Sequence, residues 1–175
     1  MRYLSSVLKA MVMHLQNLIY KEVTVLQDNS LDKDKVEIRK DYYNSGALHR
    51  ETPYVNGEKQ GIERDYYESG ALWYETPYVN GNMHGIAKGY YYESGALWRE
   101  TPYVNGRMHG IDKEYYESGD LDRETPYDDG KMHGIEKYYG KDTSNIDCII
   151  LYNKDREVLT LCCESYGAAS TKSYI

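Results

Sequence analysis

One short pattern returns four times in this chain, and its spacing constrains the fold more than any other feature. Gly46, Gly70, Gly95 and Gly119 hold the same place in successive copies, so the period is 24, 25 and 24 residues. A fixed period of this length is typical of arrays in which each unit buries its surface against its neighbours. The four copies cover about residues 38–134, and "GIEKYYG" starts a fifth that is not completed.

Each copy reads as a β-hairpin. In the second copy, "IERDYY" and "ALWYETPYV" are rich in Tyr, Trp, Val and Ile, and "ESG" separates them. Asn-Gly follows at 56–57, 80–81 and 105–106, with Asp-Gly at 129–130; this dipeptide favours a type I′ turn, in which both central residues have positive φ. The sequence therefore predicts a mostly β fold, a single-layer antiparallel meander with two strands per repeat.

Counting residues through the turns predicts an irregularity in every repeat. With a three-residue "ESG" loop and a two-residue Asn-Gly loop, opposed residues advance 23 positions per unit, whereas the repeat has 24. A one-residue slip would turn every side chain to the other face, so one loop must be longer or a strand must carry a bulge. We expect it near Pro77 and its equivalents, because Pro cannot donate to the ladder. The third repeat has a further residue in "GYYY", where Gly89 can accommodate a bulge.

The flanks differ from the array and divide the chain into residues 1–35, 36–139 and 140–175. Apolar residues near the N-terminus follow one helical stripe, which predicts an amphipathic helical cap rather than a secretory signal: Leu4, Leu8, Met11, Leu15 and Leu18. At the other end "IDCIILYN" and "EVLTLCC" predict a capping hairpin, followed by a tail. The odd number of Cys indicates no disulfide framework, so we expect buried thiols and a reducing cytoplasm.

The charge of the chain disfavours several classes of partner. The net charge is −7, and residues 36–137 hold all of the excess, with 12 basic and 19 acidic side chains. Such a surface repels phosphate backbones and anionic lipid headgroups, so nucleic acid is disfavoured and a membrane is a weaker expectation than a protein. A basic protein partner fits this charge best.

The chemically capable residues of the repeat do not form a catalytic or metal-binding pattern. His84, His109 and His133 lie one repeat apart, which is about 10 Å in a meander, whereas ligands of one ion lie within about 4 Å of each other. Glutamates also recur once per repeat, at a separation too large for paired carboxylates: Glu51, Glu75, Glu100 and Glu124. We expect no enzyme, metal or cofactor, His side chains that pack at the turn, and a following Gly at positive φ or in close backbone contact.

Aromatic residues and variable positions give the best candidates for a binding surface. The "YY" pairs place one Tyr on each face of a strand, where rings stack while hydroxyls stay in water, or line a groove for a peptide or sugar. Positions that change between copies are either neutral variation or a contact patch, and Trp73 with Trp98 is the leading candidate. The proposed partner-binding residues are Trp73, Trp98, Tyr74, Arg99, Arg50 and Arg123.

The pattern "YYESGALWxETPYVNGxMHGI" resembles the MORN repeat (membrane occupation and recognition nexus), especially its bacterial variant. The resemblance implies an elongated sheet of hairpins with a groove, and a scaffolding role in protein or lipid contact. It also implies an antitoxin or immunity-like partner of a toxin, as for several bacterial proteins of this type.

Three functions follow as hypotheses. The leading one is a non-enzymatic repeat scaffold that binds a protein partner, such as a toxin, in a bacterial cytoplasm. The second is peripheral lipid binding anchored by the N-terminal helix, and the third is a carbohydrate-binding groove. The oligomeric state stays open.

Overall fold

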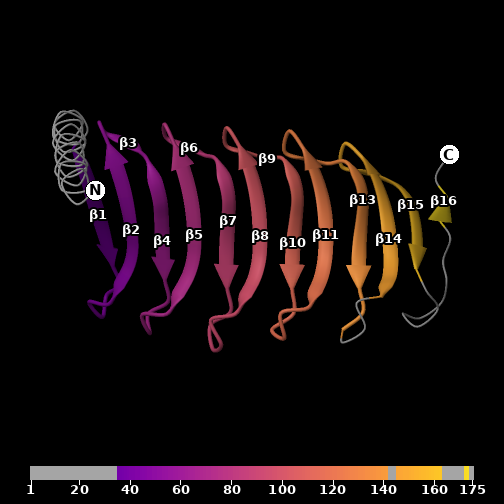
Figure 1. The fold of residues 1–175 in the computed structure, drawn as a ribbon, viewed down its shortest axis with the longest axis horizontal. Coiled ribbons are helices and arrows are strands. Elements are labelled where there is room, and N and C mark those ends of the chain that lie inside the picture. The colour runs from indigo at the N-terminus through magenta and orange to yellow at the C-terminus, as the bar shows by residue number, and fades with distance from the viewer. Residues whose placement is uncertain (1–34, 142–144, 163–171, 174–175) are drawn as a thin grey trace, which may run out of the picture. The chain divides into compact units, whose positions relative to one another are not determined.

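The protein forms one open antiparallel sheet whose strands lie side by side in chain order (Figure 1). A computed structural model describes residues 35–141, 145–162 and 172–173. The predicted antiparallel meander of hairpins is confirmed in these residues. The predicted N-terminal helical cap falls on residues 1–34, which lie outside the described residues.

In each repeat two long strands are followed by a strand of two residues. The long strands and the last strand, β16, form the main path of the sheet, and the short strands β3, β6, β9 and β12 each pair with the end of the strand before them. Their bounds are β1 (Val36–Tyr42), β2 (Leu48–Val55), β3 (Glu58–Lys59), β4 (Gly61–Tyr66), β5 (Leu72–Val79), β6 (Asn82–Met83), β7 (Gly85–Tyr90), β8 (Leu97–Val104), β9 (Arg107–Met108), β10 (Gly110–Tyr115), β11 (Leu121–Asp128), β12 (Lys131–Met132), β13 (Gly134–Tyr139), β14 (Ile146–Asn153), β15 (Arg156–Cys162) and β16 (Lys172–Ser173).

The Asn-Gly turns have the predicted conformation. Asn80 has φ 48° and Gly81 φ 76°, and the other turns of this type match them. Each turn is also tied to the previous repeat, because the Gly81 amide donates to the Lys59 carbonyl at 2.9 Å and the Gly106 amide to the Met83 carbonyl at 2.8 Å. A turn residue that satisfies a backbone group of the previous unit joins neighbouring hairpins along this edge.

A bulge lies in every second long strand, but away from Pro. Asp65 pairs with Tyr74 and Tyr66 pairs with Leu72, so Trp73 is left without an opposed residue. Trp98, Asp122 and Asp147 occupy the same place in later hairpins. The variable position of the repeat is thus its bulge position, where no cross-strand partner restricts the choice of side chain.

A second irregularity does lie opposite Pro, as predicted. Met83 pairs with Tyr78 and Lys88 with Glu75, so five steps on one strand match three on the other. The two extra residues are accommodated around His84 and Gly85. Gly85 has φ 109°, and a Cβ there would lie 3.2 Å from Cγ of Pro77. Both predictions for this glycine, positive φ and close contact, are confirmed.

The prediction that Gly89 accommodates the extra residue of the third repeat is wrong. Gly89 pairs with Arg99, in the same register as Asp65 with Tyr74. The extra residue lies instead in the loop, where the Tyr91 amide donates to the Ala96 carbonyl across four residues rather than three. Tyr92 is the residue added, and a longer loop disturbs no strand pairing.

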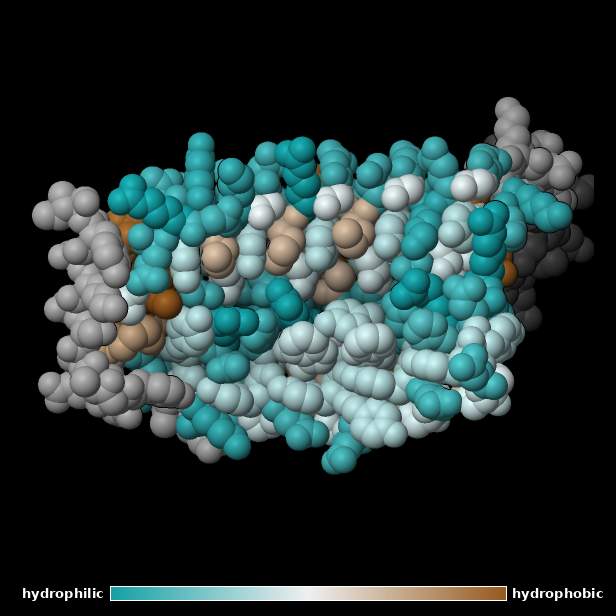
Figure 2. Space-filling model, turned by 180° about the vertical axis from the view of Figure 1, so that it is seen from behind, coloured by the Kyte–Doolittle hydropathy of each residue, from teal (hydrophilic) through white to brown (hydrophobic). Residues whose placement is uncertain are grey.

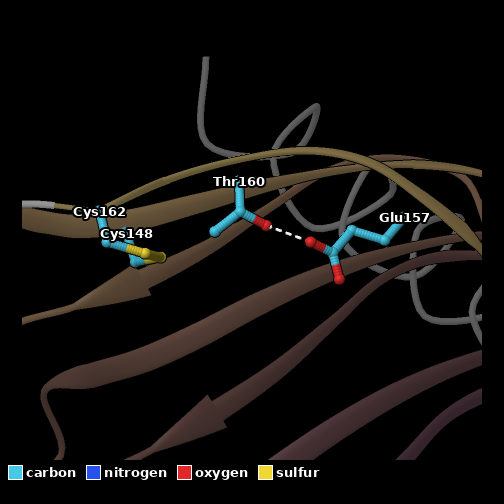
Figure 3. The surroundings of a disulfide bond; sticks show 4 residues. All are labelled: Cys148, Glu157, Thr160 and Cys162. Atoms are coloured by element: carbon cyan, nitrogen blue, oxygen red, sulfur yellow. Dashed lines mark hydrogen bonds between the residues drawn. A yellow bond between two sulfur atoms is a disulfide. The ribbon is translucent and has the colours of Figure 1, made fainter. Parts of the chain in front are cut away.

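The fifth hairpin is completed, contrary to expectation. β13 pairs with β14 in the register of the earlier repeats, although Asn145 and its neighbours replace the usual turn sequence. β14 then pairs with β15 in the predicted final hairpin. Cys148 lies opposite Cys162 there and the two are joined by a disulfide (Figure 3), so the prediction of buried free thiols is wrong for this pair.

The two faces of the sheet carry different side chains, and neither holds an apolar core. Strand alternation places Ile62, Arg64 and Tyr66 on one face, here called the isoleucine face, and Glu63 and Asp65 on the other, here called the aromatic face. Among the described residues, Ala87 is the one buried apolar side chain. The other buried side chains are polar, and all lie on the aromatic face: Thr52, Glu63, Asp65, Thr101, Asp112, Thr125 and Glu136.

Candidate partner-binding surface

The isoleucine face carries an exposed apolar row beside a row of ion pairs. Five isoleucines, one per repeat, are each between 42% and 53% exposed: Ile38, Ile62, Ile86, Ile111 and Ile135. Next to them, Lys40 pairs with Glu51 at 2.7 Å and Arg64 with Glu75 at 3.0 Å. Each cation of this row is therefore matched by a carboxylate of the neighbouring strand.

The recurring glutamates are part of this ladder, which explains why they repeat. Tyr90 donates to Glu75 at 3.0 Å and Tyr115 to Glu100 at 3.0 Å. Burial and these hydrogen bonds to a carboxylate raise the pKa of both tyrosines to about 12. The hydrogen bond from Lys40 lowers the pKa of Glu51. The prediction that Tyr hydroxyls stay in water is wrong here, since each joins one repeat to another.

The histidines of the repeat lie at the turns with exposed side chains. The backbone amides of His84, His109 and His133 each donate to the carbonyl of a Pro at 3.0 Å. Nδ1 of His109 lies 3.3 Å from Asp128. No group of three potential metal ligands occurs among the described residues.

Threonine and acidic side chains alternate along the middle of the aromatic face. Thr52 donates to Glu63 at 2.7 Å, and Thr125 donates to Glu136 at 2.7 Å. Burial opposes the charge of Glu63, but hydrogen bonds from Lys59 and Thr52 outweigh it and lower its pKa. Buried charges of this kind are tolerated because each is paired.

Three of the proposed binding residues, the arginines, form ion pairs on this face. Arg50 pairs with Asp65. Arg99 lies 3.0 Å from the buried Asp112. Arg123 pairs with Glu114, whose carboxylate also lies 3.8 Å from Arg99. These guanidinium groups hold neighbouring strands together.

The third repeat departs from this arrangement. Strand β7 has Ala87 and Gly89 where β4 has Glu63 and Asp65, and Tyr74 of β5 replaces the arginine that would face them. Tyr74 lies opposite Gly89, as Arg50 lies opposite Asp65. The acid and its arginine are thus lost together, and the strands β5 and β7 lack the buried ion pair of their neighbours.

Aromatic rings lie over Gly89, the smaller of these two residues. A Cβ on Gly89 would lie 2.4 Å from Nε1 of Trp98 and 3.0 Å from a ring carbon of Tyr74. Trp98 therefore packs directly over the backbone of β7. Trp73 has Asp65 at the corresponding place and is 37% exposed. The absence of a side chain at Gly89 lets Trp98 lie deeper than Trp73.

The rings form one continuous cluster, here called the aromatic bay, made of Tyr67, Trp73, Tyr74, Tyr92 and Trp98. Successive centroids lie 4.8 Å apart for Tyr92 and Tyr67, 5.5 Å for Tyr67 and Trp73, 5.3 Å for Trp73 and Tyr74, and 6.0 Å for Tyr74 and Trp98. Tyr92 is 54% exposed. In Figure 2 large pale rings gather in the lower half of the face, on the side of the "ESG" turns. Exposed rigid aromatic surface is typical of partner anchors.

The structure thus separates the six proposed binding residues. It brings Trp73, Tyr74 and Trp98 together in the bay, with the Arg99 guanidinium 5.7 Å from the Trp98 ring, while Arg50 and Arg123 lie in structural ion pairs. The sequence did not predict that Tyr67 and Tyr92 belong to this cluster. The third tyrosine of "GYYY" was a signal for Tyr92, because a residue inserted into a loop has no cross-strand partner and its side chain can lie on the surface.

The geometry described above agrees with a family comparison. Three consecutive segments match the MORN repeat variant. They are residues 59–80, 83–105 and 108–129, each of which runs from a short strand through one hairpin to the next Asn-Gly or Asp-Gly turn. Among curated proteins, none matches the chain. The meander also includes hairpins outside the three MORN segments, since β1 and β2 precede them and β13 and β14 follow them.

The MORN repeat is in general a scaffold that binds proteins or membranes. Within the part of the chain that the structure describes, no helix is long and apolar enough to cross a bilayer.

Proposed function

We propose that the chain is a non-enzymatic repeat scaffold that binds a protein partner through the aromatic bay. The observation that supports this proposal is the continuous cluster of five rings, partly exposed, between strands β5 and β7, which lack the buried ion pair that the neighbouring described repeats have. Packing between strands explains why the other repeats have an arginine paired with an acid. Packing alone does not explain why the rings that replace this pair are exposed, whereas binding of a partner does.

The test is site-specific photo-crosslinking of the full chain in its native cell. A crosslinking residue replaces Trp73 in one variant and Ile111 in a matched control, because both positions are exposed and they lie on opposite faces. We expect one protein to be captured from position 73, and to be lost when Trp98 is changed to Ala. Equal capture from position 111 would contradict the proposal.

A second candidate is contact with a lipid surface through the isoleucine face. The row of five exposed isoleucines supports it, whereas the paired Lys and Glu side chains beside them give no net positive charge. The test is flotation with neutral and anionic vesicles, in which Ile86→Asp with Ile111→Asp should abolish co-migration. A chain that stays at the bottom of the gradient with both vesicle types would exclude this candidate.

The finer proposal is a toxin as partner and a bacterial cytoplasm as location, and its support is the resemblance to the bacterial variant of the repeat. Alkylation of thiols in intact cells tests the location. In a reducing compartment Cys148 and Cys162 should react as free thiols. A pair that stays bonded would point to an oxidising compartment.

A further inference from the structure

One margin of the aromatic face carries carboxylates with no cation among them. This margin, here called the acidic margin, follows the turns beside the aromatic bay and consists of Glu68, Glu93, Glu117, Asp120 and Asp122. The segments 67–73, 91–98 and 116–122 contain these five acids and no Lys, Arg or His. The Asn-Gly margin, by contrast, has side chains of both signs. Its cations include Lys59, Arg107 and Lys131, and its acids include Glu58 and Asp129.

The acids of this margin are free of ion pairs. Glu68, Glu93 and Glu117 are exposed, and no described residue forms an ion pair with any of them. Burial and then the charges of Asp122, Glu117 and Glu114 raise the pKa of Tyr91, which places several carboxylates around one hydroxyl of the margin. In the middle of this face, Asp65, Glu63 and Asp112 have arginine or lysine partners. The acidic margin therefore adds uncompensated negative charge beside the bay.

The rings and the acids select the same kind of group. The face of an indole or phenol ring attracts a cation, and guanidinium does so most often because it is planar and weakly hydrated. One such contact already exists in the bay, where Cζ of Arg99 lies 5.7 Å from the Trp98 ring centre. Trp73 has no such cation in its described surroundings and is 37% exposed. Its ring is open to a guanidinium from outside.

The spacing of the margin fits a polypeptide. Equivalent residues of successive repeats lie two strands apart, about 10 Å. A polyproline II chain rises about 3.1 Å per residue and presents every third side chain on one side, about 9 Å apart. A segment with a cation at every third residue therefore matches the turns at Glu68, Glu93 and Glu117 one for one.

We infer that the acidic margin and the aromatic bay together bind an extended, arginine-rich segment of the protein partner. This inference rests on the proposed function and adds the chemistry of the partner. Guanidinium groups lie over Trp73 and along the margin, each beside one turn carboxylate. The Arg99 guanidinium stays in its ion pairs with Asp112 and Glu114 and takes no part.

The experiment measures fluorescence anisotropy of a labelled peptide with Arg at every third position, separated by Ser and Pro, against the full chain. Citrulline replaces Arg in a neutral control peptide, and a second control has the same composition with the arginines contiguous. We expect binding that weakens as salt is added and falls at least about tenfold with citrulline, because surface charge contacts are screened and additive in this range. Equal binding of the citrulline peptide would overturn the inference.

Protein variants locate the binding. Glu68→Gln, Glu93→Gln and Glu117→Gln combined should weaken binding about tenfold, while the folded state stays intact because all three side chains are exposed. Glu58→Gln, Asp128→Asn and Asp129→Asn combined is the matched control, because it removes three exposed carboxylates from the other margin, and it should leave binding unchanged. An equal loss with this control would mean unspecific attraction by net charge and would overturn the inference.

Two further outcomes separate this inference from the proposed function. If spermine displaces the peptide at equal concentration, the margin recognises any polycation and the assignment to a spaced segment fails. If the triple Gln variant binds the crosslinked partner as the unchanged chain does, while Trp98→Ala loses it, the inference fails and the proposed function stands. If both variants keep the partner, the two proposals fail together.

Discussion

Strand pairs β8–β10 and β5–β7 occupy the same place in successive repeats, but different side chains fill the space between the two strands. Between β8 and β10, Arg99 lies against Asp112 and Glu114, and Thr101 donates to Asp112. Between β5 and β7, Ala87 and Gly89 stand at the positions of these acids, and the rings of Trp98 and Tyr74 lie against Gly89. The difference shows that the space between neighbouring strands must be filled by side chains whose polar groups are paired, but that these side chains can be either charged or aromatic. One repeat can therefore have aromatic side chains there, which are available for binding.

The largest expected effect comes from removing the arginine of the charged pair. Arg99→Ala leaves the carboxylate of Asp112, which is 2% exposed, with a hydroxyl as its one remaining close partner. An uncompensated buried charge is expensive, and we expect a loss of about 3 kcal/mol in the free energy of unfolding. Urea denaturation followed by far-UV circular dichroism measures it.

Asp112→Asn in the same background is the control for this prediction, because it removes the buried negative charge that Arg99→Ala leaves without a cation. We expect it to recover at least half of the lost stability. If the double variant is as unstable as Arg99→Ala alone, the cost arises from lost packing of the arginine stem rather than from charge.

A smaller effect is expected in the uncharged pair. Gly89→Ala places a methyl group 2.4 Å from Nε1 of Trp98, so the indole must move. Overpacking of this kind costs about 1–3 kcal/mol. The chain has two Trp, and both lie in the bay, so intrinsic fluorescence should shift to the red as Trp98 becomes as exposed as Trp73.

A double-mutant cycle checks the cause. With Trp98→Ala the two closest contacts of the methyl group are gone and the one with a ring carbon of Tyr74, at 3.0 Å, remains. Gly89→Ala should then cost less than in the unchanged chain, and the interaction between the two changes should account for the difference. Strictly additive effects would mean that the backbone of β7, and not the indole, is disturbed.

The tyrosine–glutamate hydrogen bonds on the isoleucine face should contribute equally to stability in the two regions. Tyr90 of β7 and Tyr115 of β10 both have a pKa of about 12, raised by burial and by hydrogen bonds to Glu75 and Glu100. A raised pKa means that the folded state holds the proton more tightly than the unfolded chain, whose tyrosines titrate near pH 10. Stability from these groups is complete below about pH 10 and is lost as the pH rises towards 12.

Thermal unfolding at pH 8 and pH 11 tests this symmetry. Tyr90→Phe and Tyr115→Phe should each lower the stability at pH 8 by about 1 kcal/mol, through the lost hydrogen bond. Each variant should also lose less stability than the unchanged chain between pH 8 and pH 11, by a similar amount. If one of the two variants keeps the full loss of stability at pH 11, the tyrosine–glutamate hydrogen bonds are not equivalent in the two regions.

Sequence predicted the parts of this fold that depend on backbone chemistry. The positive φ of Asn80 and Gly81 follows from the residues themselves, and so does the positive φ of Gly85. Counting residues required one extra residue per repeat, but a sum cannot give its position. Two extra residues lie opposite Pro77, where the irregularity was predicted, and the bulge at Trp73, which was not predicted, offsets one of them. The bulge at Trp73 decides which residues share a face beyond it.

The candidate site could be predicted in part for the same reason. Trp73 and Trp98 were identified because they vary at a fixed place in the repeat, and Tyr74 because it replaces an arginine. The reason for that replacement lies in Gly89, which is 15 residues away in the chain and opposite Tyr74 in the sheet. Pairing across strands is set by the register, so the joint loss of acid and arginine becomes visible once the bulge is placed.

The smallest effect on stability, and the clearest separation of stability from binding, is expected at the bulge positions. Trp73 has no opposed residue and is 37% exposed, so Trp73→Ala should cost less than about 1 kcal/mol. Trp98 covers Gly89, so Trp98→Ala opens space over β7 and should cost more. Both changes remove ring surface from the bay and should weaken partner binding alike. Parallel urea titrations and crosslinking yields compare the two variants. If the loss of capture follows the loss of stability, the bay acts through the fold of β7. If capture falls equally in both while stability falls mainly for Trp98→Ala, the rings themselves contact the partner, and the uncharged pair has exchanged an ion pair for a binding surface.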